Sequence, residues 1–443
     1  MTKVGMVFLG CPKNQVDAEI LLNIIAEGGY EICGDPALSD IAIVNTCGFI
    51  ESAKQDSINE IIELGTLKKE GRIKKIIVTG CLAQRYSQEI MDNLPEVDAV
   101  VKLGANSDIC SVLERVMAGE RVLQTGENIS LPIDGERVLT TPKFFAYLRI
   151  AEGCDNCCSY CTIPQIRGRF RSRTLENILE EAKALVAGGV RELVVIAQDT
   201  TRWGEDIYGR PRLDMLLKKL CQIEDLRWIR VLYCYPERVT DDLIDVIAGD
   251  EKIVKYMDIP LQHVNADILK AMNRSGDEET IPALIEKLRQ RIPGLVLRTT
   301  LIAGFPGETE AQFDQLCEFV KRTRFERLGC FAYSAEEGTV AATLPGAVDE
   351  DEKQRRAEII TEQQLFILED WCEGKIGTEM TVLVESYDRY AECFFGRSYA
   401  DAPDIDCKVF FTAKKRPSPG QFVTVCIEEA IEGDLFGSLK EEE

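Results

Sequence analysis

Short apolar segments alternate with helical patterns along most of this 443-residue chain, and this alternation restricts the fold more than any other feature. In the N-terminal part, apolar runs at 4–9, 41–45, 75–79 and 97–102 are each followed by a stretch with helical periodicity. Repeated strand–helix units form a parallel sheet with helices on its faces. We therefore predict a parallel α/β domain over residues 1–127.

A second series of the same kind follows a stretch at 128–142 that contains proline and glycine and reads as a linker. Its strands are expected at 145–150, 192–197, 228–234, 256–260, 296–302 and 328–333. Six such units fit a partial (β/α)6 barrel of the TIM type, because eight are needed to close the full form. We predict this central domain over residues 140–373.

The pattern changes after a charged helix expected at 351–373. Short apolar segments at 381–384, 392–395, 408–411 and 422–427 are separated by turn residues. This spacing indicates a small all-β barrel over residues 375–443. The expected fold class is therefore α/β, with a β-barrel at the C-terminal end.

The charge of the chain favours a basic partner. Asp and Glu number 75 against 52 Lys and Arg, so the net charge is −23. Such a chain repels nucleic acid over most of its surface, although a high negative charge also aids solubility. We find no signal peptide and no apolar window long enough to span a membrane, and we predict a cytoplasmic protein. In that setting the 17 cysteines are packing residues, reactive thiols or metal ligands rather than disulfides.

Three cysteines follow the first strand of the predicted barrel in a Cys-x3-Cys-x2-Cys frame, namely Cys154, Cys158 and Cys161. Three thiolates on one loop can hold a cubane iron–sulfur cluster whose fourth iron is open to a ligand. The mouth of a β/α barrel is also where reacting groups lie. Cys157 allows a second interpretation, in which two adjoining Cys-x2-Cys pairs bind structural zinc. Zinc-binding pairs are usually a dozen or more residues apart, so we favour the cluster and leave Cys157 outside it.

This segment resembles the signature of the radical S-adenosylmethionine superfamily. The resemblance implies a [4Fe–4S] cluster, an external electron donor and reductive cleavage of S-adenosylmethionine to a 5′-deoxyadenosyl radical. Many members hold the cofactor's amino group with Gly-Gly-Glu after the second strand, where this chain has Ala-Gln-Asp-Thr at 197–200. Gln198 is therefore the expected cofactor contact. Gly304 and Gly307 resemble the glycine segment that lets the adenine approach the backbone, although a tight turn also requires glycine.

A second set of cysteines occupies one register in the N-terminal domain. Cys11, Cys47 and Cys81 each stand at the end of a predicted strand and just before a helix. Strand ends of a parallel sheet lie on one edge, where ligands bind, so the three thiols are expected to converge. Three unrelated buried cysteines are the alternative, but a shared register at three strand ends is hard to obtain by chance.

Two such triads followed by a β-barrel resemble the methylthiotransferase family over essentially the whole chain. The resemblance implies two [4Fe–4S] clusters and attachment of a methylthio group to an unreactive carbon. Cys154, Cys158 and Cys161 would bind the radical cluster, and Cys11, Cys47 and Cys81 the auxiliary one. S-adenosylmethionine would serve both as radical source and as methyl donor.

Two substrate classes are known for this family, namely an adenosine beside the tRNA anticodon and an aspartate of the small-subunit ribosomal protein S-twelve. The barrel resembles a TRAM domain, which often binds RNA. Residues 375–443 contain 8 Lys and Arg against 14 Asp and Glu, a net charge of −6, which is the wrong sign for RNA. The Asp-Ala-Pro stretch at 401–403 also resembles the aspartate-modifying branch. We therefore expect a methylthio group on the aspartate β-carbon of this basic protein, with tRNA modification as the alternative and direct tRNA binding not expected.

His263 is the sole histidine of the chain. Hydrogen abstraction by a carbon radical needs no base in its first step. We therefore interpret His263 as a structural or substrate-contacting residue and predict no acid–base catalytic residue.

Overall fold

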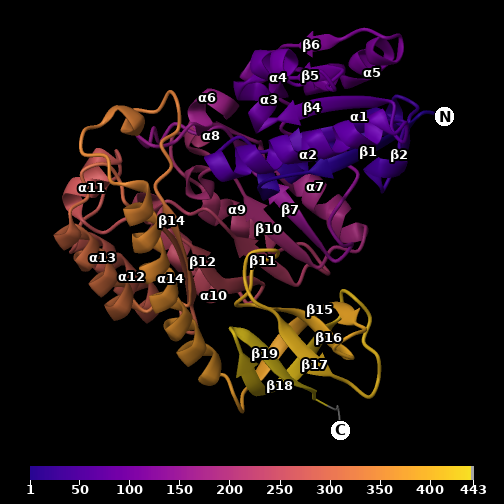
Figure 1. Ribbon diagram of the computed structural model, residues 1–443. Helices are drawn as coiled ribbons and strands as arrows, with labels where there is room; N and C mark the ends of the chain where they lie inside the picture. Colours follow the sequence, from indigo (N-terminus) through magenta and orange to yellow (C-terminus); the bar gives the residue numbers. More distant parts are fainter. Residues whose placement is uncertain (441–443) are drawn as a thin grey trace.

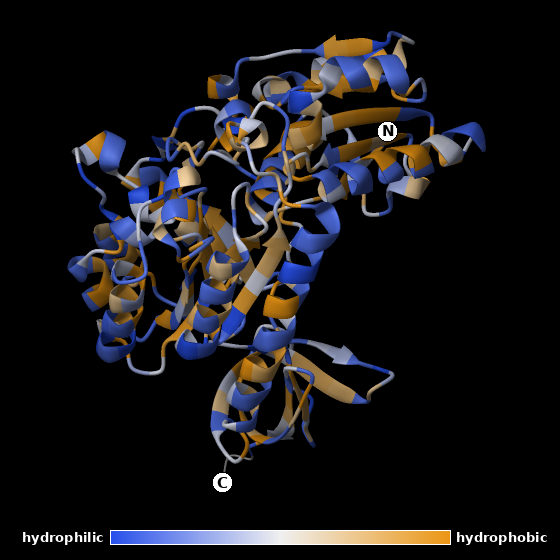
Figure 2. Cartoon of the chain, turned by 60° about the vertical axis from the view of Figure 1, so that its left-hand side comes forward, coloured by the Kyte–Doolittle hydropathy of each residue, from blue (hydrophilic) through white to orange (hydrophobic). Residues whose placement is uncertain are grey.

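The structure is a computed structural model that describes residues 1–440, and its three main sheets follow one another along the chain (Figure 1). The N-terminal sheet lies at one end of the molecule and the C-terminal barrel at the other (Figure 1). Apolar residues concentrate on the strands and on the inner sides of the helices, whereas the outer helix surfaces are mostly hydrophilic (Figure 2). This distribution follows from burying the strands of a parallel sheet on both faces.

Six parallel strands form the N-terminal sheet in the spatial order β2-β1-β3-β4-β5-β6. They are β1 (Lys3–Phe8), β2 (Glu31–Cys33), β3 (Ile41–Thr46), β4 (Lys75–Gly80), β5 (Ala99–Val101) and β6 (Val122–Gln124). The helices are α1 (Pro12–Glu27), α2 (Glu51–Lys69), α3 (Cys81–Arg85), α4 (Ser87–Asn93) and α5 (Ile109–Met117). Ile43 and Val44 are neighbours on β3 and belong to separate cores on opposite faces of the sheet. The sequence pattern predicted four of these strands and missed the three-residue edge strands β2 and β6.

The strand order of this sheet reverses beside β1, which has β2 on one side and β3 on the other. In open α/β sheets, ligands bind outside the carboxyl ends of the strands at such a point. The loops after the neighbouring strands β1, β3 and β4 carry Cys11, Cys47 and Cys81. The topology therefore places all three cysteines at one edge of the sheet.

The central sheet also has six parallel strands, in the order β14-β13-β12-β11-β10-β7, so strands adjacent in the chain are adjacent in space. They are β7 (Phe145–Arg149), β10 (Glu192–Ile196), β11 (Trp228–Val231), β12 (Ile253–Asp258), β13 (Val296–Ala303) and β14 (Arg327–Ala332). β7 and β14 form the two edges, and the sheet stays open between them. All six strands were predicted, because each is a continuous apolar run bounded by turn residues.

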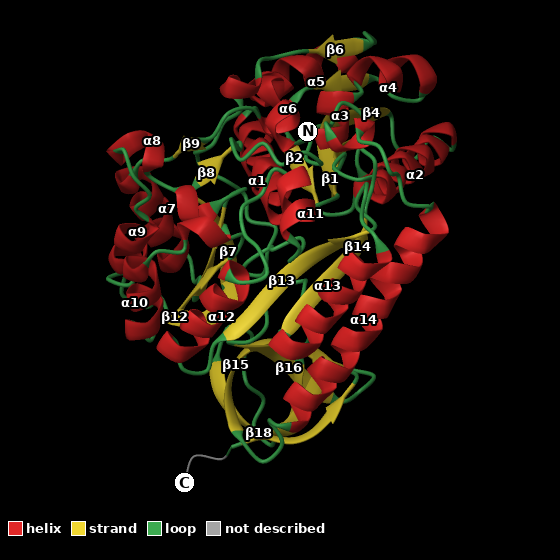
Figure 3. Cartoon of the chain, turned by 90° about the vertical axis from the view of Figure 1, so that its left-hand side faces the viewer, coloured by secondary structure: helices red, strands yellow, loops and turns green. Residues whose placement is uncertain are grey.

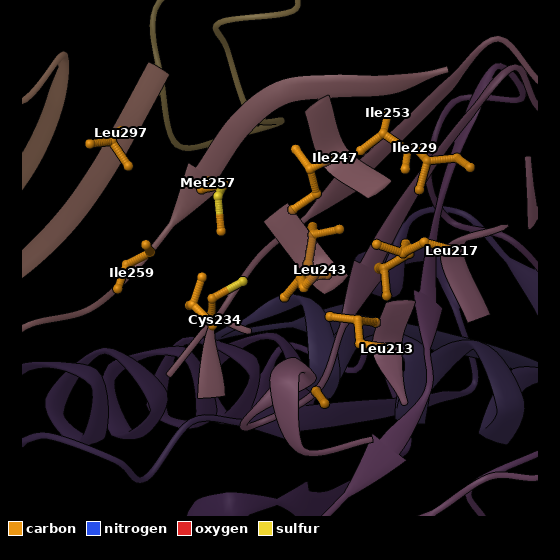
Figure 4. Close-up of a cluster of buried hydrophobic side chains, with 14 of the residues drawn as sticks. Leu213, Leu217, Ile229, Cys234, Leu243, Ile247, Ile253, Met257, Ile259 and Leu297 are labelled. Carbon is orange, nitrogen blue, oxygen red and sulfur yellow. The ribbon is translucent and has the colours of Figure 1, made fainter. Parts of the chain in front are cut away.

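Helices cover the convex face of this sheet. They are α7 (Leu175–Ala187), α9 (Leu213–Leu220), α10 (Asp241–Gly249), α12 (Thr280–Arg291), α13 (Glu310–Thr323) and α14 (Glu350–Glu373). Shorter elements are β8 (Ala151–Glu152), α6 (Ile163–Arg167), β9 (Arg171–Ser172), α8 (Glu205–Tyr208) and α11 (Ala266–Ala271). Leu217 and Leu243 of the helices meet Ile229, Ile253 and Met257 of the strands in an aliphatic core (Figure 4). α14 packs along β14 and leads to the C-terminal barrel (Figure 3).

The concave face of the central sheet carries buried charges at alternate strand positions. These residues are Arg149, Glu192, Arg230, Asp258 and Arg327, together with the half-buried Arg298. Each is paired, for example Arg230 with Glu192 at 2.9 Å and Arg298 with Asp258 at 3.0 Å. Buried charges are tolerated when paired in this way, and here they share the concave face with apolar residues such as Phe145, Val194 and Val254.

Five strands close the C-terminal barrel in the order β15-β16-β17-β19-β18. They are β15 (Glu379–Asp388), β16 (Cys393–Ser398), β17 (Val409–Thr412), β18 (Phe422–Ile431) and β19 (Asp434–Leu439). The core of the barrel contains Val382, Phe394, Phe411 and Val425. The sequence pattern predicted four strands and missed β19, which begins with a polar residue and contains a glycine.

Residues 399–408, which join β16 to β17, form a floor loop that closes the amino end of the central barrel. Arg327 forms an ion pair with Asp401 at 2.7 Å, and the hydroxyl of Tyr256 donates a 2.6 Å hydrogen bond to Asp406. The guanidinium of Arg230 donates to the carbonyl oxygen of Tyr399 at 2.8 Å. The Asp-Ala-Pro stretch seen in the sequence therefore lies inside the protein, where it covers the charged residues of the concave face.

We expect Arg327→Met to destabilise the contact between the central sheet and the barrel by about 3–5 kcal/mol, because it leaves a buried Asp401 without its cation. The matched control is Arg324→Met, which removes an ion pair to Asp370 in which both side chains are at least half exposed. That loss should be about 1 kcal/mol or less. Urea unfolding followed by tryptophan fluorescence measures both, since Arg327 lies 4.6 Å from the ring of Trp371. Equal losses in the two variants would contradict the structural role of the floor loop.

Candidate metal centres

The loop that carries Cys154, Cys158 and Cys161 follows β8 at the carboxyl end of the central sheet. It begins at Gly153, whose φ of +75° lies in the left-handed region. A Cβ atom at this position would lie 2.1 Å from the carbonyl oxygen of Arg169. Glycine is therefore required immediately before the first cysteine of the frame.

All three sulfurs of this loop have hydrogen-bond donors. Backbone N–H groups two residues further along donate to the Sγ atoms of Cys154 and Cys161, each at 3.5 Å. The Sγ atom of Cys158 lies 3.7 Å from the guanidinium of Arg274 and 3.8 Å from the hydroxyl of Tyr235. These donors favour a negative charge on the sulfurs, which is the form that binds a metal.

The three thiols influence one another. Burial, with a smaller contribution from the nearby Cys158, raises the pKa of Cys154 to about 11. Burial and Cys158 also raise the pKa of Cys161. Metal binding has to displace these protons. Cys157 differs from the other three, because its side chain is exposed and its φ of +52° is in the left-handed region.

Backbone contacts bring the loops of the N-terminal cysteines together. Gly10, with a φ of +106°, precedes Cys11, and a Cβ atom there would lie 3.1 Å from Cβ of Cys47. Gly80, with a φ of +94°, precedes Cys81, and a Cβ atom there would lie 2.4 Å from a backbone oxygen of the β3 end. Two glycines thus allow the strand ends to approach closely.

The electrostatics of Cys81 also place these three thiols near one another. Burial raises the pKa of Cys81, with contributions from Cys11 and Cys47 and against the lowering effect of Arg167, to about 12. The guanidinium of Arg167 lies 3.6 Å from the Cys81 sulfur. A cation is therefore in place to stabilise a thiolate at this edge.

Both donor sets consist of thiols alone, which suits iron–sulfur chemistry rather than hard cations. Within residues 1–440, no three His, Cys, Asp or Glu side chains are gathered tightly enough to enclose a single metal ion. A cubane cluster is wider than one ion and is held by cysteine thiolates. The residues present are therefore compatible with a cluster at each edge.

A buried ionic network joins the two edges. Arg167, at the end of the helix after Cys161, contacts Glu152 at 3.0 Å and Asp17 at 2.8 Å. Arg149 pairs with the same two carboxylates, and all four side chains are buried. Burial would raise the pKa of Glu152, but Arg167 and Arg149 lower it to about 2. Glu152 is therefore ionised at neutral pH and fixes the position of Arg167 between the two sets of cysteines.

Gln198 belongs to the same network. Its amide nitrogen donates a 2.7 Å hydrogen bond to Glu152, while its buried amide oxygen has no hydrogen-bond partner in the described structure. The neighbouring Asp199 accepts a 2.9 Å hydrogen bond from Asn156 of the cysteine loop. Hydrogen bonds thus connect the end of β10 to the cysteine loop, and the amide oxygen of Gln198 remains as an acceptor without a partner.

The glycines after β13 form a turn with structural partners of its own. Gly304 has a φ of +74°, and a Cβ atom there would lie 2.4 Å from the side chain of Lys353 in α14. Its N–H donates to Glu308 at 2.9 Å. Gly307 has a φ of +86°, and a Cβ atom there would meet no neighbour within 4 Å. His263 is buried beside Glu308, and burial lowers its pKa to about 3, so the ring is neutral.

The sequence pattern did not identify the charged residues that surround the cysteines. Lys13, Glu152 and Arg167 are buried there and Arg274 is half-buried, although nothing in the spacing of the cysteines implies them. A signal was available for Arg149, because an arginine inside an otherwise apolar strand is unusual and predicts a buried partner. The residues that pair with these charged side chains come from other segments of the chain, so only the folded structure identifies them.

Family profiles match three successive parts of the chain. Residues 3–102 match the uncharacterized protein family UPF0004, residues 148–320 the radical SAM superfamily, and residues 376–439 the TRAM domain. Among solved structures, the radical S-adenosylmethionine methyltransferase TsrM from Kitasatospora setae covers 75% of this chain and 75% of its own, with a TM-score of 0.57 and 14% identity. That likeness concerns the fold alone.

Curated relatives match the whole chain. The ribosomal protein uS12 methylthiotransferase RimO of Thermoanaerobacter sp. (strain X514) is 47% identical over 438 residues, which cover 99% of this chain and 100% of the relative. The protein of the same name from Caldanaerobacter subterraneus subsp. tengcongensis is 48% identical over 438 residues with the same coverage. Fold and sequence thus define a radical S-adenosylmethionine enzyme, whose cofactors include S-adenosylmethionine and a [4Fe–4S] cluster. The chain belongs to the ribosomal protein uS12 methylthiotransferase family.

The helices of residues 1–440 do not meet the requirements of a membrane span. None combines sufficient length with sufficient apolar character to cross a bilayer. The longest of them, α14, is rich in acidic and basic residues.

Proposed function

We propose that this protein attaches a methylthio group to the β-carbon of an aspartate in ribosomal protein uS12, with two [4Fe–4S] clusters. The observation that carries the proposal is the pair of cysteine triads joined by Arg167, which follows one triad in the chain and contacts Cys81 of the other. A reaction that makes a radical at one cluster and delivers sulfur from a second needs both within reach of one substrate carbon.

Cys154, Cys158 and Cys161 would hold the radical cluster, and Cys11, Cys47 and Cys81 the auxiliary cluster. When bound, these groups supply the electron for cofactor cleavage and the sulfur for insertion. The chain itself supplies donors to the sulfurs, a guanidinium beside Cys158 and another beside Cys81. Burial of these groups excludes water and strengthens their electrostatic interactions.

Gln198 and the Gly304–Gly307 turn would contact S-adenosylmethionine. The free buried oxygen of Gln198 supports this assignment, because an ammonium group is the donor that such an acceptor lacks. At the turn, the open space beside Gly307 supports an approach of the adenine there. At Gly304, the side chain of Lys353 already lies against the backbone. This glycine therefore also allows α14 to pack against the turn.

The domain extents would be residues 1–127 for the auxiliary cluster, 140–373 for the radical barrel and 375–443 for the TRAM-like barrel. The net charge of −6 over the last of these favours a basic protein partner over RNA. None of the 17 cysteines, all of which lie within residues 1–440, forms a disulfide, which supports a reducing, cytoplasmic setting that also contains an electron donor. The alternative substrate is a tRNA adenosine beside the anticodon.

Product analysis tests the proposal. The reconstituted enzyme is incubated with S-adenosylmethionine, a reductant and either uS12 or tRNA, and the products are examined by mass spectrometry. We expect a methylthio group on one aspartate of uS12 and none on tRNA, because the acidic barrel repels phosphate. Methylthio-adenosine in tRNA without a modified aspartate would contradict the proposal.

A further inference from the structure

Lys13 is a buried cation at the junction of the N-terminal and central domains. It lies two residues after Cys11 in the first turn of α1, and only 8% of the residue is exposed. Its ammonium is 3.3 Å from the centre of the Tyr233 ring and 3.4 Å from the carbonyl oxygen of Ala197. Ala197 and Tyr233 follow β10 and β11, so the ammonium lies over the mouth of the central barrel.

The ammonium lacks the carboxylate partner that other buried cations around it have. Arg149 and Arg167 share Asp17 and Glu152, and Arg298 pairs with Asp258. Within residues 1–440, no carboxylate lies within 4.0 Å of the Lys13 ammonium, whose one hydrogen bond is the long contact to Ala197. An ammonium has three donors, and burying it without an anion is unfavourable.

The surroundings hold this ammonium in place. Tyr233 has a φ of +61°, a strained value for a tyrosine, and its N–H donates to Asp258 at 2.9 Å. The ring lies against one side of the ammonium as a cation–π partner and leaves other N–H bonds free. Strained residues that are fixed by their neighbours cluster at functional sites.

We infer that Lys13 binds the side-chain carboxylate of the aspartate that is modified. This inference rests on the proposed function and adds to it the residue that selects the substrate. The carbon that receives the methylthio group is bonded directly to that carboxylate. An ion pair between Lys13 and this carboxylate therefore holds the reacting carbon beside Lys13, between the cysteines of the two domains. Lys13 acts here as a positioning residue.

S-adenosylmethionine also carries a carboxylate, and Gln198 adjoins Ala197, so the two sources have to be separated. The holoenzyme is titrated anaerobically with uS12 and with uS12 whose target aspartate is replaced by Asn. We expect the wild type to bind the aspartate form at least about tenfold more tightly. In Lys13→Met this ratio should fall to about one, because the ion pair is absent in both complexes. Lys13→Arg should retain part of the ratio.

Lys69→Met is the matched control, since Lys69 is an exposed lysine of the same domain. It should keep the wild-type ratio. Iron content is measured for each variant, and Lys13→Gln replaces Lys13→Met if the latter loses iron. A Lys13 variant with full iron content and an unchanged ratio would overturn the inference.

Equilibrium binding of S-adenosylmethionine without uS12 completes the test. It should change by about twofold or less in Lys13→Met, well below the effect of losing a charge pair. Weakened cofactor binding with a preserved aspartate ratio would assign Lys13 to the cofactor and overturn the inference. Failure of the wild type to bind or modify uS12 would overturn the proposed function as well, which product analysis of the wild type identifies separately.

Discussion

Replacing Cys154, Cys158 and Cys161 together by Ala is expected to abolish the cleavage of S-adenosylmethionine to 5′-deoxyadenosine. These thiols stand on one loop at the carboxyl end of the central sheet, with a hydrogen-bond donor at each sulfur. Without them the electron has no cluster from which to reach the sulfonium. Chromatography of the nucleoside products under dithionite measures the effect, which should be a fall to the background rate.

Cys157→Ala is the control for this loss. Cys157 belongs to the same loop but is exposed, so its replacement should leave both iron content and cleavage close to those of the wild type. The triple variant should instead fall from about eight irons per chain to about four. Cleavage that survives the triple replacement, or that is lost with Cys157 alone, would contradict the assignment of the radical cluster.

The second large effect concerns the auxiliary cysteines. Replacing Cys11, Cys47 and Cys81 together by Ala should abolish methylthio transfer while cofactor cleavage continues. Cleavage continues because these thiols lie at the edge of a separate sheet. The loop of Cys154, Cys158 and Cys161 retains the hydrogen-bond donors to its sulfurs. Mass spectrometry of uS12 and quantification of 5′-deoxyadenosine in the same reaction separate the two steps, and iron should again fall to about four per chain.

Cys33 and Cys110 provide the control for this variant, because both lie in the N-terminal domain away from the strand ends that carry the triad. Replacing them by Ala should leave methylthio transfer intact. Some loss of stability is expected in the triple variant, since Arg167 loses a sulfur partner at Cys81. Complete loss of cleavage in a folded auxiliary variant would show that the two sites cannot act independently.

Much of the fold could be predicted from the pattern of apolar residues. The strands of the central sheet are continuous apolar runs, and each was predicted because burial on both faces demands such a run. Within the three main sheets, the strands that were missed are β2, β6 and β19. The first two have three residues each, too few to show a period, and β19 contains a polar start and a glycine. Short edge strands owe their pairing to neighbours rather than to their own sequence.

The cysteines of the candidate site were predictable, whereas their surroundings were not. A shared register at strand ends in the sequence is sufficient to indicate Cys11, Cys47 and Cys81. The pairing of Asp17 with Arg149 and Arg167 joins segments more than 130 residues apart. Ion pairs of that kind depend on how two domains dock, and no periodicity within one segment encodes them.

The same holds for the floor loop, whose Asp-Ala-Pro stretch suggested a branch of the family but not a location. Three of its residues bond to strands of the central sheet, through Arg230, Tyr256 and Arg327. A chimera that joined this chain at residue 375 to the barrel of a relative would therefore replace the floor loop as well as the outer surface of the barrel. A stable chimera at that boundary must therefore take the floor loop and the strand residues that contact it from the same parent protein.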